Sequence, residues 1–242
     1  MSLLAPTSFG AEQYRTLRHK VEQLHGTANL TIVAISSAES GDGKTMTTIN
    51  LAGALGQAPE ARVLLVDADL RRSSMAERLG LDGSDGQGLI SAIVDPHLSL
   101  RDVAEPCPAF NLSLVRAGRR PSAPYELLKS PRLGQLLDDA RQQYDYVVLD
   151  MPPLIPLPDC RVIGRWVDGF LIVVTAHKTR RGSLEEALKV LDPEKIIGLV
   201  FNGDDQPRTR YVDGSGWPYG PARRRWWAGF RNGHRASVDE IH

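Results

Sequence analysis

Short apolar runs recur along the chain, and polar or amphipathic stretches separate them. Most of these runs are rich in β-branched residues, whereas residues 111–115 alternate between apolar and polar side chains. Runs of this kind are typical of strands, and the β-branched ones are typical of strands buried in a parallel sheet. The predicted strands are Leu30–Ile35, Arg62–Val66, Asn111–Val115, Tyr146–Leu149, Phe170–Thr175 and Ile196–Phe201.

Helical patterns lie between the predicted strands, at residues 11–25, at 45–55 and, as a short helix, at 89–94. Ser130-Pro131 is a favourable N-cap and first-turn pair for another helix. The apolar residues that follow recur at i, i+3, i+4 and i+7, which makes one face of that helix apolar. They are Leu133, Leu136, Leu137 and Ala140. A last helix is predicted to begin at Ser183, which would form a capping box with Glu186.

Strands that alternate with helices predict an α/β fold, in which a parallel sheet has helices on both faces. We expect an N-terminal helical region at 1–29, a single core domain at 30–203 and a flexible tail at 204–242. The last boundary follows from a change in composition. From Gly203 onward the chain has six glycines, three prolines and few aliphatic residues, which predicts little packed structure.

The overall composition is that of a globular protein. The chain has 242 residues, enough for a full core, and its 29 basic and 29 acidic residues leave no net charge to indicate a partner. The apolar run Phe170–Ala176 is far shorter than the ~20 residues needed to span a bilayer. Residues 1–6 do not resemble a secretion signal, and Cys107 and Cys160 form no metal or disulfide motif. We therefore expect a cytoplasmic protein with reduced thiols.

The predicted tail combines basic and aromatic residues. Between Pro207 and His242 it has seven arginines and three acidic residues, 7 − 3 = +4, together with three tryptophans and one phenylalanine. The run Arg223–Trp227 suits an anionic lipid surface, because cations and tryptophans both favour the membrane interface. A tail without a partner is the interpretation that we favour, and nucleic-acid binding is not expected.

The segment Ser36–Thr45 follows the first predicted strand and leads into a helix. Its last five residues read G-D-G-K-T, although the strict phosphate-loop pattern has glycine at the position of Ala38. Glycines let backbone N–H groups converge on phosphate oxygens, and the helix N-terminus adds partial positive charge. We expect Lys44 to contact the β- and γ-phosphates of a nucleoside triphosphate and Thr45 to reach Mg²⁺. The prediction is a P-loop NTPase-like fold; the alternative is that the glycines only close a turn.

Three aspartates follow other predicted strands. Asp150 ends one buried strand, and Asp67 and Asp69 end another. A carboxylate at such a position has no structural role unless it binds something, and two carboxylates spaced i, i+2 point the same way from an extended segment. Together with Thr45 these oxygens suit Mg²⁺. In the alternative interpretation, Asp67 or Asp69 forms a surface ion pair with one of the arginines that follow.

These motifs, in this order, resemble the bacterial tyrosine kinases that work with capsule and exopolysaccharide export machinery. That family is similar to P-loop ATPases of the septum-placement and partition type, but has a second acidic motif. The similarity extends from about Gly10 to Gly203. The segments that carry it are Glu12–Arg18, Leu64–Arg72, Gly88–Ser91, Ala117–Ser130 and Tyr144–Pro153.

The resemblance implies ATP as nucleotide and Mg²⁺ as cofactor. Lys44, Asp67 and Asp69 would be catalytic: Lys44 offsets charge on the γ-phosphoryl group, Asp67 binds metal and Asp69 orients or deprotonates a tyrosine hydroxyl. The metal ligands would be Thr45, Asp67 and Asp150. Asn202 resembles the family's adenine-reading amide, with a turn residue as the alternative. The full set of expected nucleotide contacts is Ser40, Gly41, Asp42, Gly43, Lys44, Thr45, Thr47 and Asn202.

The resemblance also implies partners. Glu12, Arg15 and Arg18 lie on nearly one helical face and match the family's E-x-x-R-x-x-R oligomerisation helix, which implies a homo-oligomer. A membrane polysaccharide co-polymerase or adaptor is the expected activator, and it would place the protein peripherally at the inner face of the cell membrane. Members usually end in a cluster of tyrosines, whereas Tyr211 and Tyr219 are the candidate acceptors of this tail.

The expected function is that of an ATP-dependent, autophosphorylating protein-tyrosine kinase that regulates capsular or exopolysaccharide synthesis and export. The alternative is a nucleotide-dependent oligomerising scaffold of the same machinery with little or no phosphotransfer, which the sparse tyrosines favour. A partition-type motor is disfavoured by Glu39. Partition and septum-placement ATPases have at this position a lysine that reaches a partner's phosphate, and a carboxylate there would repel the triphosphate.

Overall fold

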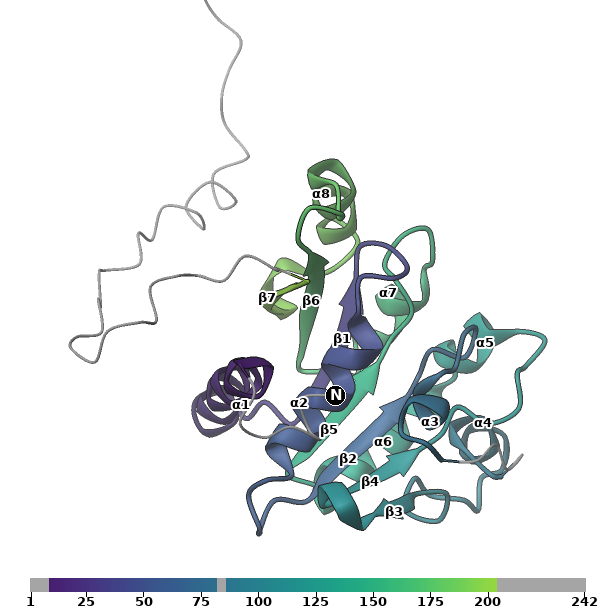
Figure 1. Ribbon diagram of the computed structural model, residues 1–242. Helices are drawn as coiled ribbons and strands as arrows, with labels where there is room; N and C mark the ends of the chain where they lie inside the picture. Colours follow the sequence, from purple (N-terminus) through teal and green to yellow (C-terminus); the bar gives the residue numbers. More distant parts are fainter. Residues whose placement is uncertain (1–8, 82–85, 204–242) are drawn as a thin grey trace, which may run out of the picture. The chain divides into compact units, whose positions relative to one another are not determined.

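The computed structural model describes residues 9–81 and 86–203 (Figure 1). The chain divides into a unit at Met1–Asp204 and a second unit at Asp205–His242, and none of the second unit's residues is among those described. The predictions on the basic tail, including Tyr211, Tyr219 and the Arg223–Trp227 run, therefore lie outside the described residues.

A seven-stranded sheet forms the centre of the described unit, in the order β3-β4-β2-β5-β1-β6-β7. All neighbouring strands are parallel except β3 and β4, which are antiparallel. The six predicted strands are confirmed within two residues at each end. The short edge strand β3 was not predicted. The strands are β1 (Ile32–Ser37), β2 (Val63–Asp67), β3 (Glu105–Cys107), β4 (Leu112–Val115), β5 (Tyr146–Asp150), β6 (Gly169–Thr175) and β7 (Ile196–Asn202).

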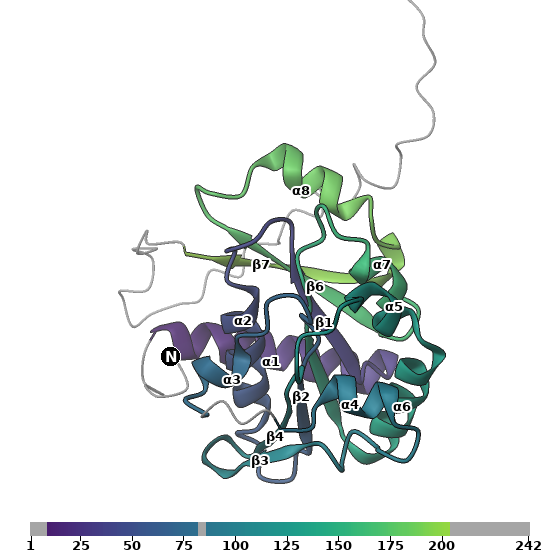
Figure 2. The same cartoon turned by 90° about the vertical axis from the view of Figure 1, so that its right-hand side faces the viewer.

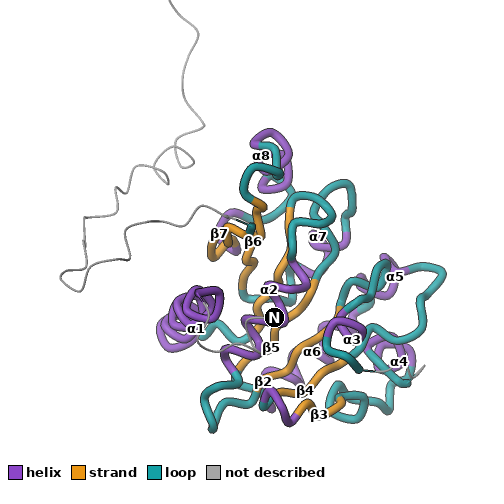
Figure 3. Tube along the Cα trace, viewed as in Figure 1, coloured by secondary structure: helices purple, strands orange, loops and turns teal. Residues whose placement is uncertain are grey.

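Helices cover both faces of this sheet, as predicted (Figures 1 and 2). Figure 3 shows how the strands gather in one layer between helices and loops. Two one-turn 3₁₀ helices, at Pro108–Phe110 and Pro193–Lys195, complete the regular structure that is described. The α-helices are α1 (Phe9–Ala28), α2 (Lys44–Leu55), α3 (Met75–Arg78), α4 (Leu89–Val94), α5 (Pro124–Lys129), α6 (Pro131–Gln143), α7 (Asp159–Ile163) and α8 (Arg181–Leu188).

Alternation along the central strands produces two separate cores. In β1, Ile32 and Ala34 pack with residues of α4, α5, α6, α7 and α8, whereas Val33 and Ile35 face α1, α2 and α3. All four side chains are at most 1% exposed. Each strand residue therefore contributes to one of two apolar layers, which is why these strands have no polar face.

The predicted helix starts are partly confirmed. The Ser130 hydroxyl accepts a hydrogen bond from the Arg132 N–H, so the predicted N-cap of α6 is confirmed. The predicted capping box of α8 is wrong. That helix begins at Arg181, after Arg180 as N-cap, and Ser183 lies inside its first turn.

Within the described residues, no helix is long and apolar enough to cross a membrane. Cys107 and Cys160 are buried free thiols.

Candidate active site

The carboxyl ends of three adjacent strands bring the predicted phosphate and metal residues together. Strand β5 lies between β1 and β2, and Asp67 pairs in register with Asp150. Both aspartates lie on the same side of their strands as Leu65 and Val148, which face α2. The P-loop leads from the end of β1 into α2. The sheet order therefore places two acidic strand ends beside the first turn of the P-loop helix.

The P-loop has the backbone conformation that its glycines predict. Gly41 and Gly43 have φ values of 85° and 89°, a left-handed region that side chains other than glycine rarely adopt. Ala38, which stands where the strict pattern has glycine, is fully buried. Helix α2 begins at Lys44, directly after Gly43. A helix N-terminus with a glycine turn before it is a ready-made phosphate site.

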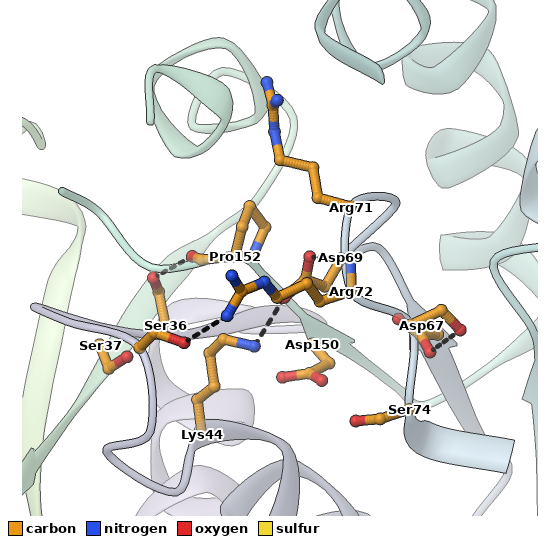
Figure 4. A network of polar contacts seen from close by, with 12 residues as sticks. Ser36, Ser37, Lys44, Asp67, Asp69, Arg71, Arg72, Ser74, Asp150 and Pro152 are labelled. Atoms are coloured by element: carbon orange, nitrogen blue, oxygen red, sulfur yellow. Dashed lines mark hydrogen bonds and ion pairs between the residues drawn. The ribbon is translucent and has the colours of Figure 1, made fainter. Parts of the chain in front are cut away.

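Lys44 reaches from this helix to the acidic side of the site (Figure 4). Its Nζ atom lies 2.8 Å from Oδ2 of Asp69, and both side chains are largely buried. Burial alone would lower the pKa of Lys44. The negative charges of Asp150, Asp69 and Asp67 outweigh that effect and raise the pKa, so the ammonium group stays charged.

Asp67 and Asp150 are almost completely buried, at 1% exposure each. Burial raises the pKa of Asp150 to about 7, although the charge of Lys44 acts in the opposite direction. Burial also raises the pKa of Asp67, against the hydrogen bonds from the Ser73 hydroxyl and the Met75 N–H. A cation bound nearby would stabilise the charged form of both buried carboxylates and so lower their pKa values.

The residues present fit a magnesium ion with bound phosphate. Oδ1 of Asp67 and Oγ1 of Thr47 are buried and have no hydrogen-bond partner among the residues that the structure describes. The Thr48 hydroxyl lies 3.3 Å from Oδ1 of Asp150, at the same end of α2. No group of three or more His, Cys, Asp or Glu side chains in the described ranges forms a metal cage. Mg²⁺ does not require one, because it usually binds one or two carboxylates, phosphate oxygens and water.

The loop after β2 holds the second acidic motif. Asp67 and Asp69 do not form surface ion pairs with the arginines that follow, so that alternative is wrong. Arg71 instead points away from the P-loop in Figure 4, and its guanidinium binds both oxygens of the fully buried Asp159, at 2.7 and 3.0 Å. The backbone N–H of Arg72 donates to Oδ1 of Asp69. Asp69 is therefore held between Lys44 and its own loop.

Asn202 and Glu39 lie at the P-loop, although the structure does not test their predicted roles. The amide of Asn202 donates from Nδ2 to the carbonyl oxygen of Asp42, at 3.0 Å. A Cβ atom on Gly43 would overlap this amide group. The backbone N–H of Glu39 donates to the carboxylate of Asp42. The predicted loop residues therefore come together with the last residue of β7.

Helix α1 contains the predicted oligomerisation residues. Arg15 forms an ion pair with Glu12 on the exposed side of the helix. Arg18 binds Glu22 and also donates to the carbonyl oxygen of Ala54, near the end of α2. Arg18, one of the three predicted interface residues, therefore contacts a second helix of the same chain, where it satisfies a C-terminal carbonyl of α2.

Residues that the sequence did not single out also contact the site. Thr175 is the last residue of β6, Lys178 and Thr179 follow that strand, and all three donate hydrogen bonds to the P-loop. Their sequence carries no motif, and only the order of the sheet places the end of β6 beside that of β1. Asp159 also lacked a signal, since a lone aspartate after a proline is a common turn residue.

The fold and this geometry define a P-loop nucleoside-triphosphate-binding domain. Consistent with that class, a family model described as an AAA domain matches residues 30–179. The chain is 30% identical over 205 residues to tyrosine-protein kinase YwqD of Bacillus subtilis (strain 168), covering 84% of this chain and 85% of YwqD. The chain belongs to the family of bacterial tyrosine kinases.

Two further comparisons support this membership. The chain is 30% identical over 210 residues to tyrosine-protein kinase wzc of Salmonella typhi, covering 86% of this chain but only 29% of wzc. The kinase domain of Escherichia coli tyrosine kinase ETK superposes with a TM-score of 0.76 at 26% identity, covering 90% of this chain and 83% of that one. The chain thus spans most of YwqD and less than a third of wzc.

Proposed function

We propose that the chain transfers the γ-phosphoryl group of ATP to tyrosine hydroxyls of proteins. The observation that carries this proposal is the contact of Lys44 with Asp69 beside the paired carboxylates of Asp67 and Asp150. In this proposal Lys44 is the phosphate-binding cation, Asp67 and Asp150 bind the metal, and Asp69 is the proton acceptor. All four side chains are buried. The names of YwqD, wzc and ETK as tyrosine kinases support the choice of acceptor.

In the proposed reaction, a bond forms between the tyrosine oxygen and the γ-phosphorus, and the bond from that phosphorus to the bridging oxygen of ADP breaks. The tyrosine proton passes to the Asp69 carboxylate, which orients the hydroxyl. Lys44 offsets the charge on the phosphates, and ADP leaves. Bound Mg²⁺ supplies further charge neutralisation, and Thr45, Asp67 and Asp150 are the residues that would hold it. Catalysis is then mostly positioning and electrostatics.

The nucleotide would lie along the loop from Ser40 to Thr45, with its phosphates on the N–H groups before α2. Thr47, whose buried hydroxyl has no hydrogen-bond partner in the described part of the chain, belongs to the same set. Asn202 would read the adenine base. The bond from its Nδ2 atom to Asp42 supports a place beside the nucleotide and leaves the carbonyl oxygen of the amide as the base-reading atom.

The proposal extends to partners. Tail tyrosines such as Tyr211 and Tyr219 would be acceptors, delivered between copies of a homo-oligomer in which the Glu12–Arg18 helix takes part. By family resemblance, a membrane polysaccharide co-polymerase or adaptor would recruit the protein to the inner face of the cell membrane. Capsular or exopolysaccharide synthesis and export would then respond to the phosphorylation state.

Peptide mass spectrometry after incubation with MgATP tests the proposal. The wild type and Lys44→Met are compared, each with and without the cytoplasmic segment of a candidate membrane activator. We expect phosphotyrosine in the wild type and none in Lys44→Met. ATP binding without phosphotyrosine, even with the activator, would instead support the oligomerising scaffold.

A further inference from the structure

We propose that the turn after β6 positions the P-loop for phosphate binding, and that Thr179 does so through the carboxylate of Asp42. This inference rests on the proposed nucleotide site and assigns Thr179 as a positioning residue for it. Asp42 makes most of the hydrogen bonds that carry this inference. Its side chain and its backbone carbonyl both bind residues that lie more than 130 positions later in the chain.

The carboxylate of Asp42 is 1% exposed, and both of its oxygens accept hydrogen bonds. Oδ2 accepts from the N–H of Glu39, at 3.1 Å, within the loop itself. Oδ1 accepts from the hydroxyl of Thr179, at 3.0 Å. A negative charge beside a triphosphate site is unfavourable for binding. A structural role explains why a carboxylate is present here: it stabilises the loop conformation, and its two hydrogen bonds compensate its charge.

Two carbonyl groups of the loop are also held from the β6 and β7 side. The carbonyl oxygen of Asp42 accepts from the Thr175 hydroxyl and from the Asn202 amide, each at 3.0 Å. The carbonyl oxygen of Gly41 accepts from Nζ of Lys178, at 2.8 Å. These three hydrogen bonds join the loop to the end of β7 and to the end of β6 and the turn after it.

The direction of these carbonyl groups fixes the direction of the N–H groups that phosphates need. A trans peptide unit is planar, so its N–H points opposite to its C=O. Because the Gly41 and Asp42 carbonyls point to the β6 and β7 ends, the N–H groups of Asp42 and Gly43 point the other way. The loop is thereby preorganised, which lowers the cost of ordering it around an anion.

The Thr179 hydroxyl is suited to this task because it joins the turn to the loop. It accepts a hydrogen bond from the N–H of Thr175, at 2.8 Å, while it donates to Asp42. The turn between these threonines includes His177, whose φ of 59° is in the left-handed region. A valine at 179 would keep the shape of the side chain but would lose both hydrogen bonds. A serine would keep both.

The test compares Thr179→Val, Thr179→Ser and the wild type by isothermal titration with MgADP and by initial rates with ATP. Thr27→Val is the matched control, because the Thr27 hydroxyl also donates a hydrogen bond, to the carbonyl oxygen of Gln23, but lies on α1. Thermal unfolding of each protein separates folding from positioning. We expect Thr179→Val to weaken MgADP binding about ten-fold and to raise KM for ATP similarly, with a smaller change in kcat.

Thr179→Ser and Thr27→Val should bind MgADP as the wild type does. A double-mutant cycle with Asp42→Asn should show that Thr179→Val adds little once the carboxylate is gone. Equal affinity of Thr179→Val and the wild type, additive effects in the cycle, or a loss of Tm without a loss of affinity would overturn the inference. If the wild type itself bound no nucleotide, the proposed function would fail instead.

Discussion

Nζ of Lys44 and Oδ2 of Asp69 lie 2.8 Å apart, and their contact joins the P-loop helix to the loop after β2. The first residue is predicted to bind phosphate and the second to accept the tyrosine proton. Each neutralises the other in a place where an unpaired charge would be costly. Substitution of the carboxylate should therefore affect chemistry and nucleotide binding in different ways.

Asp69→Asn removes the proton acceptor but keeps the shape of the side chain. We expect kcat for tyrosine phosphorylation to fall about 10²–10⁴-fold. MgADP affinity should stay the same or rise slightly, because Lys44 loses a competing anion. Asp67→Asn is the comparison, since it should raise the Mg²⁺ concentration needed for half-maximal rate. A similar loss of MgADP affinity in both variants would contradict the separate roles.

Arg71 stabilises the buried carboxylate of Asp159 through two hydrogen bonds. Arg71→Met should lower the free energy of unfolding by about 2 kcal/mol, because it leaves that carboxylate buried and unpaired. Urea denaturation measures the loss. The double variant with Asp159→Asn should recover part of it. Arg62→Met, which breaks the more exposed pair with Asp145, should cost much less.

Asp168 predicts a pH dependence of stability. Burial would raise its pKa, but Arg141 and the N–H groups of Ile32 and Thr31 outweigh burial and lower the pKa below the usual value. The stabilisation is then complete above the unfolded pKa of ~3.9 and is lost as pH falls further. Asp168→Asn should cost about 1–2 kcal/mol at pH 7 and progressively less below pH 4.

Urea denaturation of Asp168→Asn at several pH values measures this difference, with the exposed Asp139→Asn as control. The control should follow the wild type at every pH. A cost of Asp168→Asn that stayed constant between pH 7 and pH 3 would show that the charge of Asp168 does not contribute.

Replacement of glycine by alanine should be harmful at position 43 and stabilising at position 26. Gly43→Ala should abolish measurable MgADP binding, because a Cβ atom would strain the left-handed backbone and overlap Asn202. Gly26→Ala, in α1 with open space around it, should instead stabilise the protein by about 0.5–1 kcal/mol. Calorimetry and urea denaturation measure the two effects. Nucleotide binding by Gly43→Ala at wild-type strength would contradict the described loop geometry.

The strands and the phosphate loop could be predicted because local signals specify them. The β-branched run at β1 and the glycines before Lys44 need no distant contact to be interpreted. The edge strand Glu105–Cys107 could not be predicted, since it contains a proline and has three residues. It forms through pairing with β4, which is a tertiary effect.

The start of α8 and the contacts of the turn after β6 could not be predicted for a second reason. The spacing of Ser183 and Glu186 fits a capping box, but the helix has already begun at Arg181. A pattern of two residues does not fix a boundary on its own. The contacts of Thr179 with Asp42 depend on the order of strands in the sheet, and that order is not encoded near either residue.

Transfer of labelled phosphate tests the central claim most directly. The protein is incubated with Mg²⁺ and ATP labelled at the γ-phosphorus, and the label is divided between phosphotyrosine and inorganic phosphate. The account predicts label on tyrosine in the wild type, almost none in Asp69→Asn, and none in Lys44→Met. Label that appears only as inorganic phosphate, at equal rates in the wild type and Asp69→Asn, would contradict the assignment of a tyrosine kinase site.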